Sequence, residues 1–261
     1  MFNFHVGIPG IVPDLLNSIV QAGILKGDSS PSILSQELWQ EQFRSLVNTK
    51  QLEALLNVAA RRTAEATVAD LSALGSVAIS QHALLGTPED CFLKHKVLPY
   101  ADARIARVSD IFAAVPLTVH LTIFSQFDYL HTAMNRLPKG KAFPQPSIVP
   151  SWSKLVQRIK VAAPDRQIMV WDFENPEKIA LAFMICLLDT KDDGLIDAIA
   201  THLSVTIKRP EPAINSPEIS GVSHEMIDRM DAQYDFDLEE INRIEGVSLI
   251  LPDSIPEEFH L

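Results

Sequence analysis

The sequence lacks a long apolar run, a paired-cysteine motif and a secretion signal. No window approaches the roughly 18 consecutive apolar residues of a membrane span, so we expect no transmembrane segment. The two cysteines, Cys91 and Cys186, form no CxxC pattern. Few cysteines in a chain of this size are typical of a reducing compartment, which predicts a cytoplasmic protein. The first residues show neither a basic region nor a cleavage site, so we expect no secretion.

Basic residues are also scarce, and the imbalance lies at one end of the chain. The net charge is −11, and the part from Glu211 onward holds thirteen Asp and Glu against only Arg229 and Arg243. Because phosphate backbones are bound by clustered Lys and Arg, we expect no nucleic-acid partner. The acidic segment has two interpretations, a solvated helix face or a docking surface for a basic protein partner.

What the sequence does contain is an alternation of apolar strands and amphipathic helices. The chain has 261 residues, and at 47% hydrophobic it can bury a large core. Strands are predicted at Phe2–Val6, Ser76–Ser80, Leu117–Phe124 and Gln167–Phe173. Helices are predicted at Pro13–Leu25, Ser35–Val47, Leu52–Leu74, Ala101–Phe112, Gln126–Arg136, Trp152–Ala163, Pro176–Leu188 and Ser223–Ile244. This alternation predicts an α/β fold of three layers, a mainly parallel sheet flanked by helices.

A proline-rich stretch divides the chain unequally. Lys208–Ser220 contains three prolines and follows the last predicted helix of the α/β part. We therefore expect an α/β body at residues 1–210. Residues 211–261 are expected to form an acidic, mainly helical appendage that packs on the body and ends in an apolar stretch, Val247–Leu251.

The stretch Phe2–Val20 has the layout of a phosphate-binding loop without its side chains. An apolar strand, a turn with Gly7 and Gly10, and an amphipathic helix follow one another. In this layout, backbone N–H groups and a helix N-terminus face an anion. A P-loop also needs a Lys for the phosphate and a Ser or Thr at the start of the helix. Positions 10–13 read Gly-Ile-Val-Pro instead.

An ordered series of short motifs over about Phe2–Leu251 resembles a bacterial family of sulfotransferase-like proteins with a P-loop fold. The motifs that carry the resemblance are His5-Val6-Gly7, Ser80-Gln81-His82-Ala83 before Gly86-Thr87-Pro88, Tyr100-Ala101-Asp102-Ala103-Arg104, Ser151-Trp152, Ala163-Pro164, Val170-Trp171-Asp172-Phe173 and Tyr234-Asp235-Phe236-Asp237-Leu238. Each motif is loose, and the specificity comes from their order and spacing.

The resemblance implies binding of 3′-phosphoadenosine 5′-phosphosulfate and transfer of its sulfuryl group to an acceptor hydroxyl. Both motifs that would hold this donor are altered. Gly10 stands where the family has Lys, and Asp14 would bring a negative charge toward a polyanion. Phe124 stands where the family has the Arg that grips the 3′-phosphate, and Thr132 or Ala133 lies near the Ser position, where only Thr132 could donate a hydrogen bond. Gly7, Gly10, Asp14 and Thr132 are thus the remaining positions of a vestigial cofactor cleft.

One histidine is a weak candidate for catalysis. His82 follows a predicted strand, where α/β sheets place reactive groups, and an imidazole there could accept a hydroxyl proton. The plainer interpretation is a hydrogen-bonded histidine at a strand–loop junction. His5 and His120 lie within strands and are expected in the core or the cleft wall. We expect no metal site, because no His, Asp or Glu has ligand spacing.

Three functions remain open from the sequence. The first is a sulfotransferase-like protein that has lost donor binding and acts as a non-catalytic binding or interaction protein, with no cofactor. The second is a divergent, active sulfotransferase that uses the phosphosulfate donor, with His82 as the candidate base. The third is an unrelated α/β scaffold whose acidic tail binds a partner.

Overall fold

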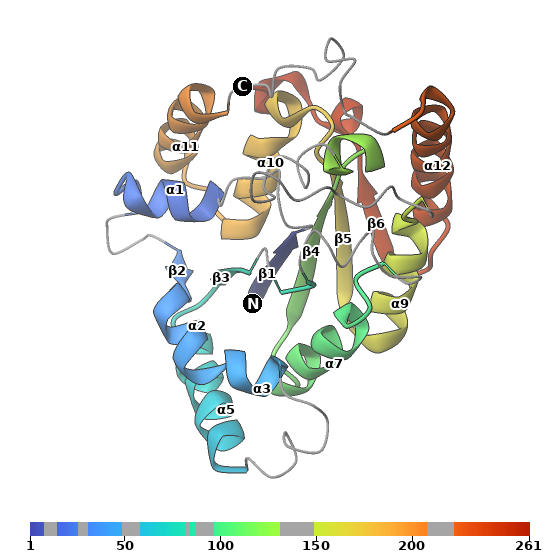
Figure 1. The fold of residues 1–261 in the computed structure, drawn as a ribbon. Helices are drawn as coiled ribbons and strands as arrows, with labels where there is room; N and C mark the ends of the chain where they lie inside the picture. Colours follow the sequence, from blue (N-terminus) through green and yellow to red (C-terminus); the bar gives the residue numbers. More distant parts are fainter. Residues whose placement is uncertain are drawn as a thin grey trace, which may run out of the picture.

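The computed structural model describes residues 1–7, 15–25, 31–48, 58–81, 84–86, 97–130, 149–207 and 222–261. Within them, six parallel strands form one sheet in the order β2-β3-β1-β4-β5-β6. The strands are β1 (Phe2–Gly7), β2 (Ser32–Ile33), β3 (Val77–Ser80), β4 (Leu117–Ile123), β5 (Gln167–Asp172) and β6 (Val247–Ile250). The predicted three-layer α/β fold is confirmed (Figure 1).

Helices cover both faces of this sheet. In chain order they are α1 (Leu15–Gln21), α2 (Gln36–Gln42), α3 (Arg44–Asn48), α5 (Val58–Ser72), α7 (Ala101–Ile111), α9 (Trp152–Ala162), α10 (Pro176–Leu188), α11 (Asp193–Thr206) and α12 (His224–Asn242). Two short 3₁₀ turns, η2 (Pro252–Ser254) and η3 (Glu257–Phe259), follow β6. No helix in these described ranges is long and apolar enough to cross a membrane.

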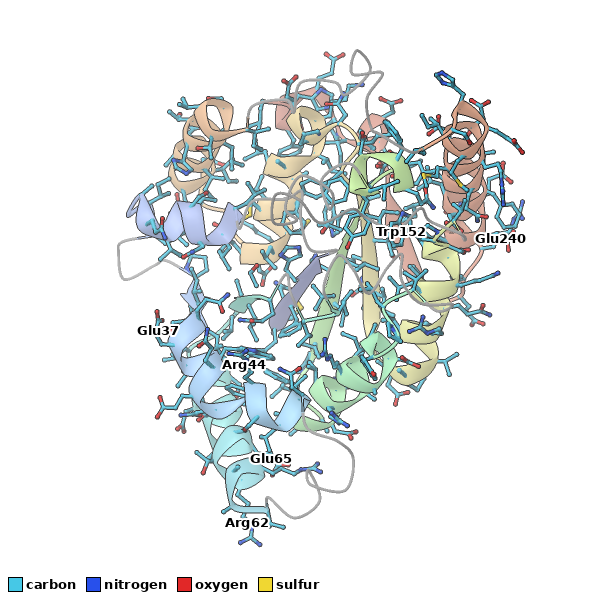
Figure 2. All side chains as sticks on the ribbon, in the orientation of Figure 1. Glu37, Arg44, Arg62, Glu65, Trp152 and Glu240 are labelled. Carbon is cyan, nitrogen blue, oxygen red and sulfur yellow. The ribbon has the colours of Figure 1, made fainter. Side chains whose placement is uncertain are left out.

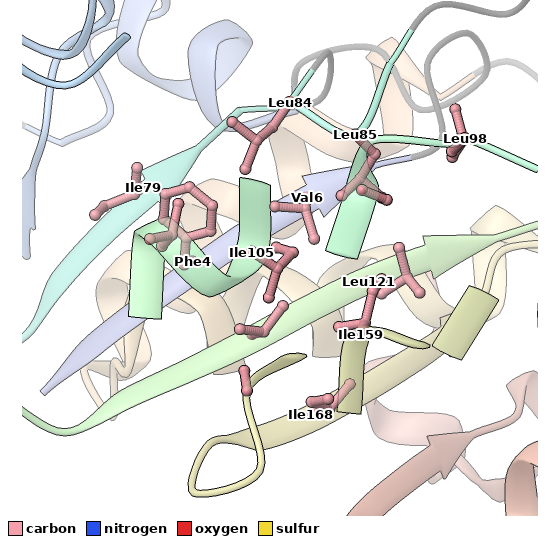
Figure 3. Close-up of a cluster of buried hydrophobic side chains, with 14 of the residues drawn as sticks. Phe4, Val6, Ile79, Leu84, Leu85, Leu98, Ile105, Leu121, Ile159 and Ile168 are labelled. Atoms are coloured by element: carbon pink, nitrogen blue, oxygen red, sulfur yellow. The ribbon is translucent and has the colours of Figure 1, made fainter. Parts of the chain in front are cut away.

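One face of the sheet, which we call the apolar face, is packed by α2, α3, α5, α7, α9 and α12. Alternate side chains of β1 and β4, such as Phe4 and Leu121, point into this layer and meet Ile105 of α7 and Ile159 of α9 (Figure 3). Aromatic rings extend the same cluster, with the ring centroids of Phe4 and Trp39 5.3 Å apart. The apolar face is therefore a continuous hydrophobic core.

The opposite face, which we call the mixed face, is packed by α1, α10 and α11. Apolar residues of these helices form a second core cluster with Trp171 and Phe173. The strand side chains that point here include polar ones: Asn3, His5, Ser80, Thr118, His120 and Thr122, all buried. The two faces thus differ in the chemistry that the strands supply.

The strand order creates a topological switch point at β1, where the connections between strands change direction. From β1 the chain passes to β2 at one edge of the sheet, and the connecting helix, α1, packs on the mixed face. From β2 onward every step runs toward the other edge, and the helices between β2 and β5 pack on the apolar face. Right-handed crossovers that run in opposite directions must cover opposite faces. Sheets of this kind bind ligands at the carboxyl ends of the strands beside such a point.

Several details differ from the sequence-based expectation. The helix expected at Ser35–Val47 is two helices that meet at Phe43, whose ring stacks on Trp39 and Phe112 in the apolar core. Helix α11 and the two-residue strand β2 were not predicted. The apolar stretch after α12 forms β6, which pairs with β5 and adds a parallel strand to the sheet.

Candidate functional site

The candidate site is the carboxyl edge of the sheet around β1. Gly7, one of the predicted cleft positions, is the last residue of β1 and lies opposite Thr122 of β4. The structure therefore places it at the switch point. The other predicted site residues, His82, Gly10, Asp14 and Thr132, lie outside the described residues.

Three polar side chains from three adjacent strands meet next to Gly7, on the mixed face. His5 of β1 forms hydrogen bonds through Nδ1 with the Ser80 hydroxyl, at 3.0 Å, and through Nε2 with the Thr122 hydroxyl, at 3.4 Å. The register explains the contact, because Ser80 is the partner of His5 across β1 and β3. These bonds tie the carboxyl ends of β3, β1 and β4 together.

A serine 3.0 Å from an imidazole has the spacing of a nucleophile and its base. Its surroundings are those of a core contact instead. His5 and Ser80 are 3% and 6% exposed, and the ring of Phe183 on α10 packs edge-on against His5 with centroids 5.0 Å apart. The cluster is best explained as a buried polar contact that fixes the switch point, and it confirms that His5 belongs to the core.

A second polar contact lies deeper on the same face. Trp171 Nε1 donates to Nδ1 of His120 at 3.2 Å, which leaves the imidazole proton on Nε2, 3.4 Å from the Asn3 carboxamide oxygen. Burial lowers the pKa of His120 to about 3. The ring is therefore neutral at physiological pH, as a buried histidine with neutral partners must be.

Next to the switch point, the carboxyl end of β4 is apolar where the family resemblance expects an arginine. Phe124 directly follows β4, is 3% exposed, and packs against Phe173 with ring centroids 6.1 Å apart. Its carbonyl oxygen accepts the Trp152 indole N–H at 2.7 Å. Phe124 therefore contributes apolar packing through its ring and one hydrogen-bond acceptor through its backbone carbonyl.

The carboxyl end of β5 carries negative charge. Tyr234 of α12 donates its hydroxyl proton to Asp172 at 2.6 Å, and the Glu174 backbone N–H donates to the same oxygen at 2.9 Å. Burial and then the charge of Asp172 raise the pKa of Glu174 to about 7, with further contributions from Asp128, Asp231 and Asp235. We call Asp128, Asp172, Glu174, Asp231 and Asp235 the edge carboxylates. Among the described residues, no group of three or more His, Cys, Asp or Glu could hold a metal ion.

A further carboxylate, Asp237 of α12, is fully buried where this helix meets the start of α9. Figure 2 labels Glu240 on α12 and Trp152 on α9. Sequence reasoning gave neither it nor Asp172 a role. A usable signal was present, since Met230, Tyr234, Asp237 and Ile241 are spaced as one buried stripe of a helix. An acid in such a stripe needs internal partners.

The molecule also has a shallow, mainly apolar hollow between α1 and α11. It is lined by Ala22, Ile24, Asp197, Ala198, Thr201, His202 and Val205. None of the predicted site residues is among them. Comparisons with protein-family models, curated proteins and solved structures found no match.

Proposed function

We propose that this chain is a sulfotransferase-like protein of the cytoplasm that no longer binds 3′-phosphoadenosine 5′-phosphosulfate and acts as a non-catalytic binding or interaction protein. The observation that supports it most directly is the charge at the carboxyl edge beside the switch point. Burial and then the charge of Asp172 raise the pKa of Glu174, and the charges of Asp128, Asp231 and Asp235 add to that shift, so the fields of these carboxylates overlap there.

A donor with two phosphate-type groups is a polyanion, and a site for it requires fixed cations or aligned N–H groups. Carboxylates in this position repel it instead, and the repulsion is strongest where burial limits screening. The apolar Phe124 at the end of β4 agrees with this, since it is packed against Phe173. A non-catalytic binding role is compatible with this structure, because such a role needs the folded sheet but not the donor.

The test is a calorimetric titration with 3′-phosphoadenosine 5′-phosphate, repeated as a thermal-shift assay at low salt, with adenosine as the uncharged control. We expect no saturable heat and no rise in the unfolding temperature at ligand concentrations up to about a millimolar, because stabilisation needs binding to the folded state. Micromolar binding that weakens as salt is added would refute the proposal.

A pair of triple variants tests the electrostatic cause. Glu174→Gln, Asp231→Asn and Asp235→Asn together remove three edge carboxylates, whereas Glu225→Gln, Glu239→Gln and Glu245→Gln remove the same charge from exposed positions elsewhere on and after α12. Any residual affinity for the polyanion should rise in the first triple variant more than in the second. Equal affinities would show that the position of the carboxylates does not matter.

A further inference from the structure

The sheet ends in two outer strands that differ in their protection. β2, at one end of the strand order, has only two residues and directly follows Pro31. β6, at the other end, has four residues, Val-Ser-Leu-Ile, without charge or proline (Figure 1). An outer strand presents unpaired backbone N–H and C=O groups, and proteins commonly protect it with lysine, proline or extreme shortness. β6 carries neither lysine nor proline.

The side of β6 that faces away from β5, which we call the β6 flank, has no strand partner in the described part of the chain. The side chains of β6 are also incompletely covered. Every residue of β1 and β4 is buried, whereas none of β6 is. Val247 and Leu249 pack at the margin of the apolar core, and Ile250 packs at the margin of the second core cluster. A further strand on the β6 flank would therefore extend both core layers as well as pair the free backbone groups.

Helix α12, which leads into β6, is fastened to the body by buried polar contacts. Tyr234 donates its hydroxyl proton to Asp172 at the carboxyl end of β5. Asp237 is fully buried and accepts five hydrogen bonds at 2.6–3.0 Å, from Ser151 Oγ, Ser153 Oγ, Gln126 Nε2, Gln233 Nε2 and the Trp152 backbone N–H. These contacts fix the helix beside β6, so the β6 flank is formed before a partner arrives. A preformed surface lowers the ordering cost of binding.

The chain around the β6 flank is negatively charged. The part from Glu211 onward holds thirteen Asp and Glu against two Arg. Exposed carboxylates stand at both ends of the strand, with Glu245 shortly before β6 and Asp253 shortly after it. Asp253 is paired with Lys178 of α10, whereas Glu245 has no ion pair among the described residues. A second copy of the chain would bring a like-charged segment to this surface, which favours a basic partner.

From these observations we infer that the β6 flank binds an extended, basic segment of another protein, which adds a seventh strand to the six-stranded sheet. In this mode of recognition, main-chain hydrogen bonds supply affinity and alternate side chains supply specificity. Apolar side chains of the segment pack beside those of β6, and its flanking basic residues meet Glu245 and Asp253. The strands β4 and β5 separate β6 from β1, so the inference does not rest on the proposed loss of donor binding.

The probe is a labelled peptide, Lys-Lys-Thr-Val-Thr-Val-Thr-Lys-Lys, whose binding to the full chain is followed by fluorescence anisotropy in low salt. We expect saturable binding that weakens as salt is added, because exposed charges are screened. One control peptide carries N-methyl groups on its three central residues and cannot pair, and a second has Glu in place of every Lys. Both controls should bind at least about tenfold more weakly. The inference is overturned if the first peptide does not bind at up to about a millimolar, or if either control binds equally well.

A matched pair of lysine substitutions at exposed positions locates the binding surface. Ser248→Lys adds a positive charge to β6 itself, as natural outer strands often carry, and should weaken peptide binding at least about tenfold. Ala232→Lys adds the same charge to α12 and should change the affinity by no more than about twofold. Because both positions are exposed, both variants should keep the unfolding temperature of the unmodified chain. Equal losses of affinity would show that the peptide does not bind at β6, and would overturn the inference.

Hydrogen exchange and light scattering identify what pairs with β6. With the peptide bound, backbone amides of residues 247–250 should exchange more slowly, whereas those of β2 should be unchanged. Slower exchange at β2 alone, or no change at 247–250, would contradict the inference. Light scattering of the free chain should report a monomer. A dimer that Ser248→Lys dissociates would show that β6 pairs with a second copy, and the basic partner would then be rejected.

Discussion

The two faces of the sheet are buried with different chemistry, and the apolar face holds the larger of the two core clusters. On the apolar face, strand side chains such as Phe4, Val6 and Leu121 meet apolar helix residues. On the mixed face, the neighbouring side chains His5, His120 and Thr122 are polar and hydrogen-bonded, and the most apolar helix, α10, covers them. The strand side chains stabilise the first face through apolar burial, whereas on the second face their contribution also depends on the protonation and pairing of polar groups.

The largest predicted effects compare one large ring on each face. Phe183 of α10 packs against His5, Trp171 and Phe173, and Phe112 packs against Phe2, Phe4 and Phe43. Both rings are almost fully buried. We expect Phe183→Ala and Phe112→Ala each to lower the free energy of unfolding by about 3–5 kcal/mol, measured by urea denaturation.

The outcome distinguishes the faces. Near-equal losses would show that the polar residues of the mixed face do not weaken its packing. A loss below about 1 kcal/mol for Phe183→Ala, against the full loss for Phe112→Ala, would mean that the mixed face collapses around the gap or is loosely packed.

The second prediction uses the acid sensitivity of the mixed face. The pKa of His120 is lowered from 6.5 to about 3 by burial. Below pH 6.5 the unfolded chain takes up a proton that the folded chain refuses, so stability is lost as pH falls from 6.5 toward 3. The slope from this group approaches about 1.4 kcal/mol per pH unit. The measurement is the free energy of unfolding at several pH values between 4 and 7.

His120→Gln removes this titration while keeping an amide that can meet Trp171 and Asn3, so its stability should change less steeply over the same range. His224→Gln, at an exposed position on α12, is the matched control and should keep the original slope. Parallel curves for all three proteins would show that His120 does not carry the acid sensitivity of the mixed face.

Much of this architecture could be predicted from local patterns. β-Branched and aromatic runs located β1, β3, β4 and β5, and Pro176 and the Ser151 cap located the starts of α10 and α9. Helix α11 was missed because only Ile199 and Leu203 of its fourteen residues are buried, which leaves a weak amphipathic pattern. Strand β2 is too short to give an alternation.

The site was less predictable, because its contacts depend on register and tertiary packing. His5 meets Ser80 and Thr122 only because β1 lies between β3 and β4 in one particular register. Four of the five donors to Asp237 are 84–111 residues away in the chain. An acid in the buried stripe of a predicted helix indicates that hydrogen-bond donors must lie next to it, but the sequence does not show which side chains provide them. Gly7, predicted in the turn after the first strand, is instead the last residue of β1.

The smallest predicted effects exchange single hydroxyl groups between the faces along β4, where Thr122 points to the mixed face and Val119 to the apolar face. Val119→Thr buries a hydroxyl among apolar side chains and should cost about 1–3 kcal/mol. Thr122→Val removes the partner of His5 Nε2 at 3.4 Å without changing the shape, and should cost about 1 kcal/mol. Both are measured by urea denaturation at pH 7. If Thr122→Val is neutral and Val119→Thr costly, the polar groups of the mixed face are tolerated there without stabilising it. If both substitutions lower the free energy of unfolding by the same amount, adding a hydroxyl to the apolar face costs no more than removing one from the mixed face. The two faces would then differ less than their composition indicates.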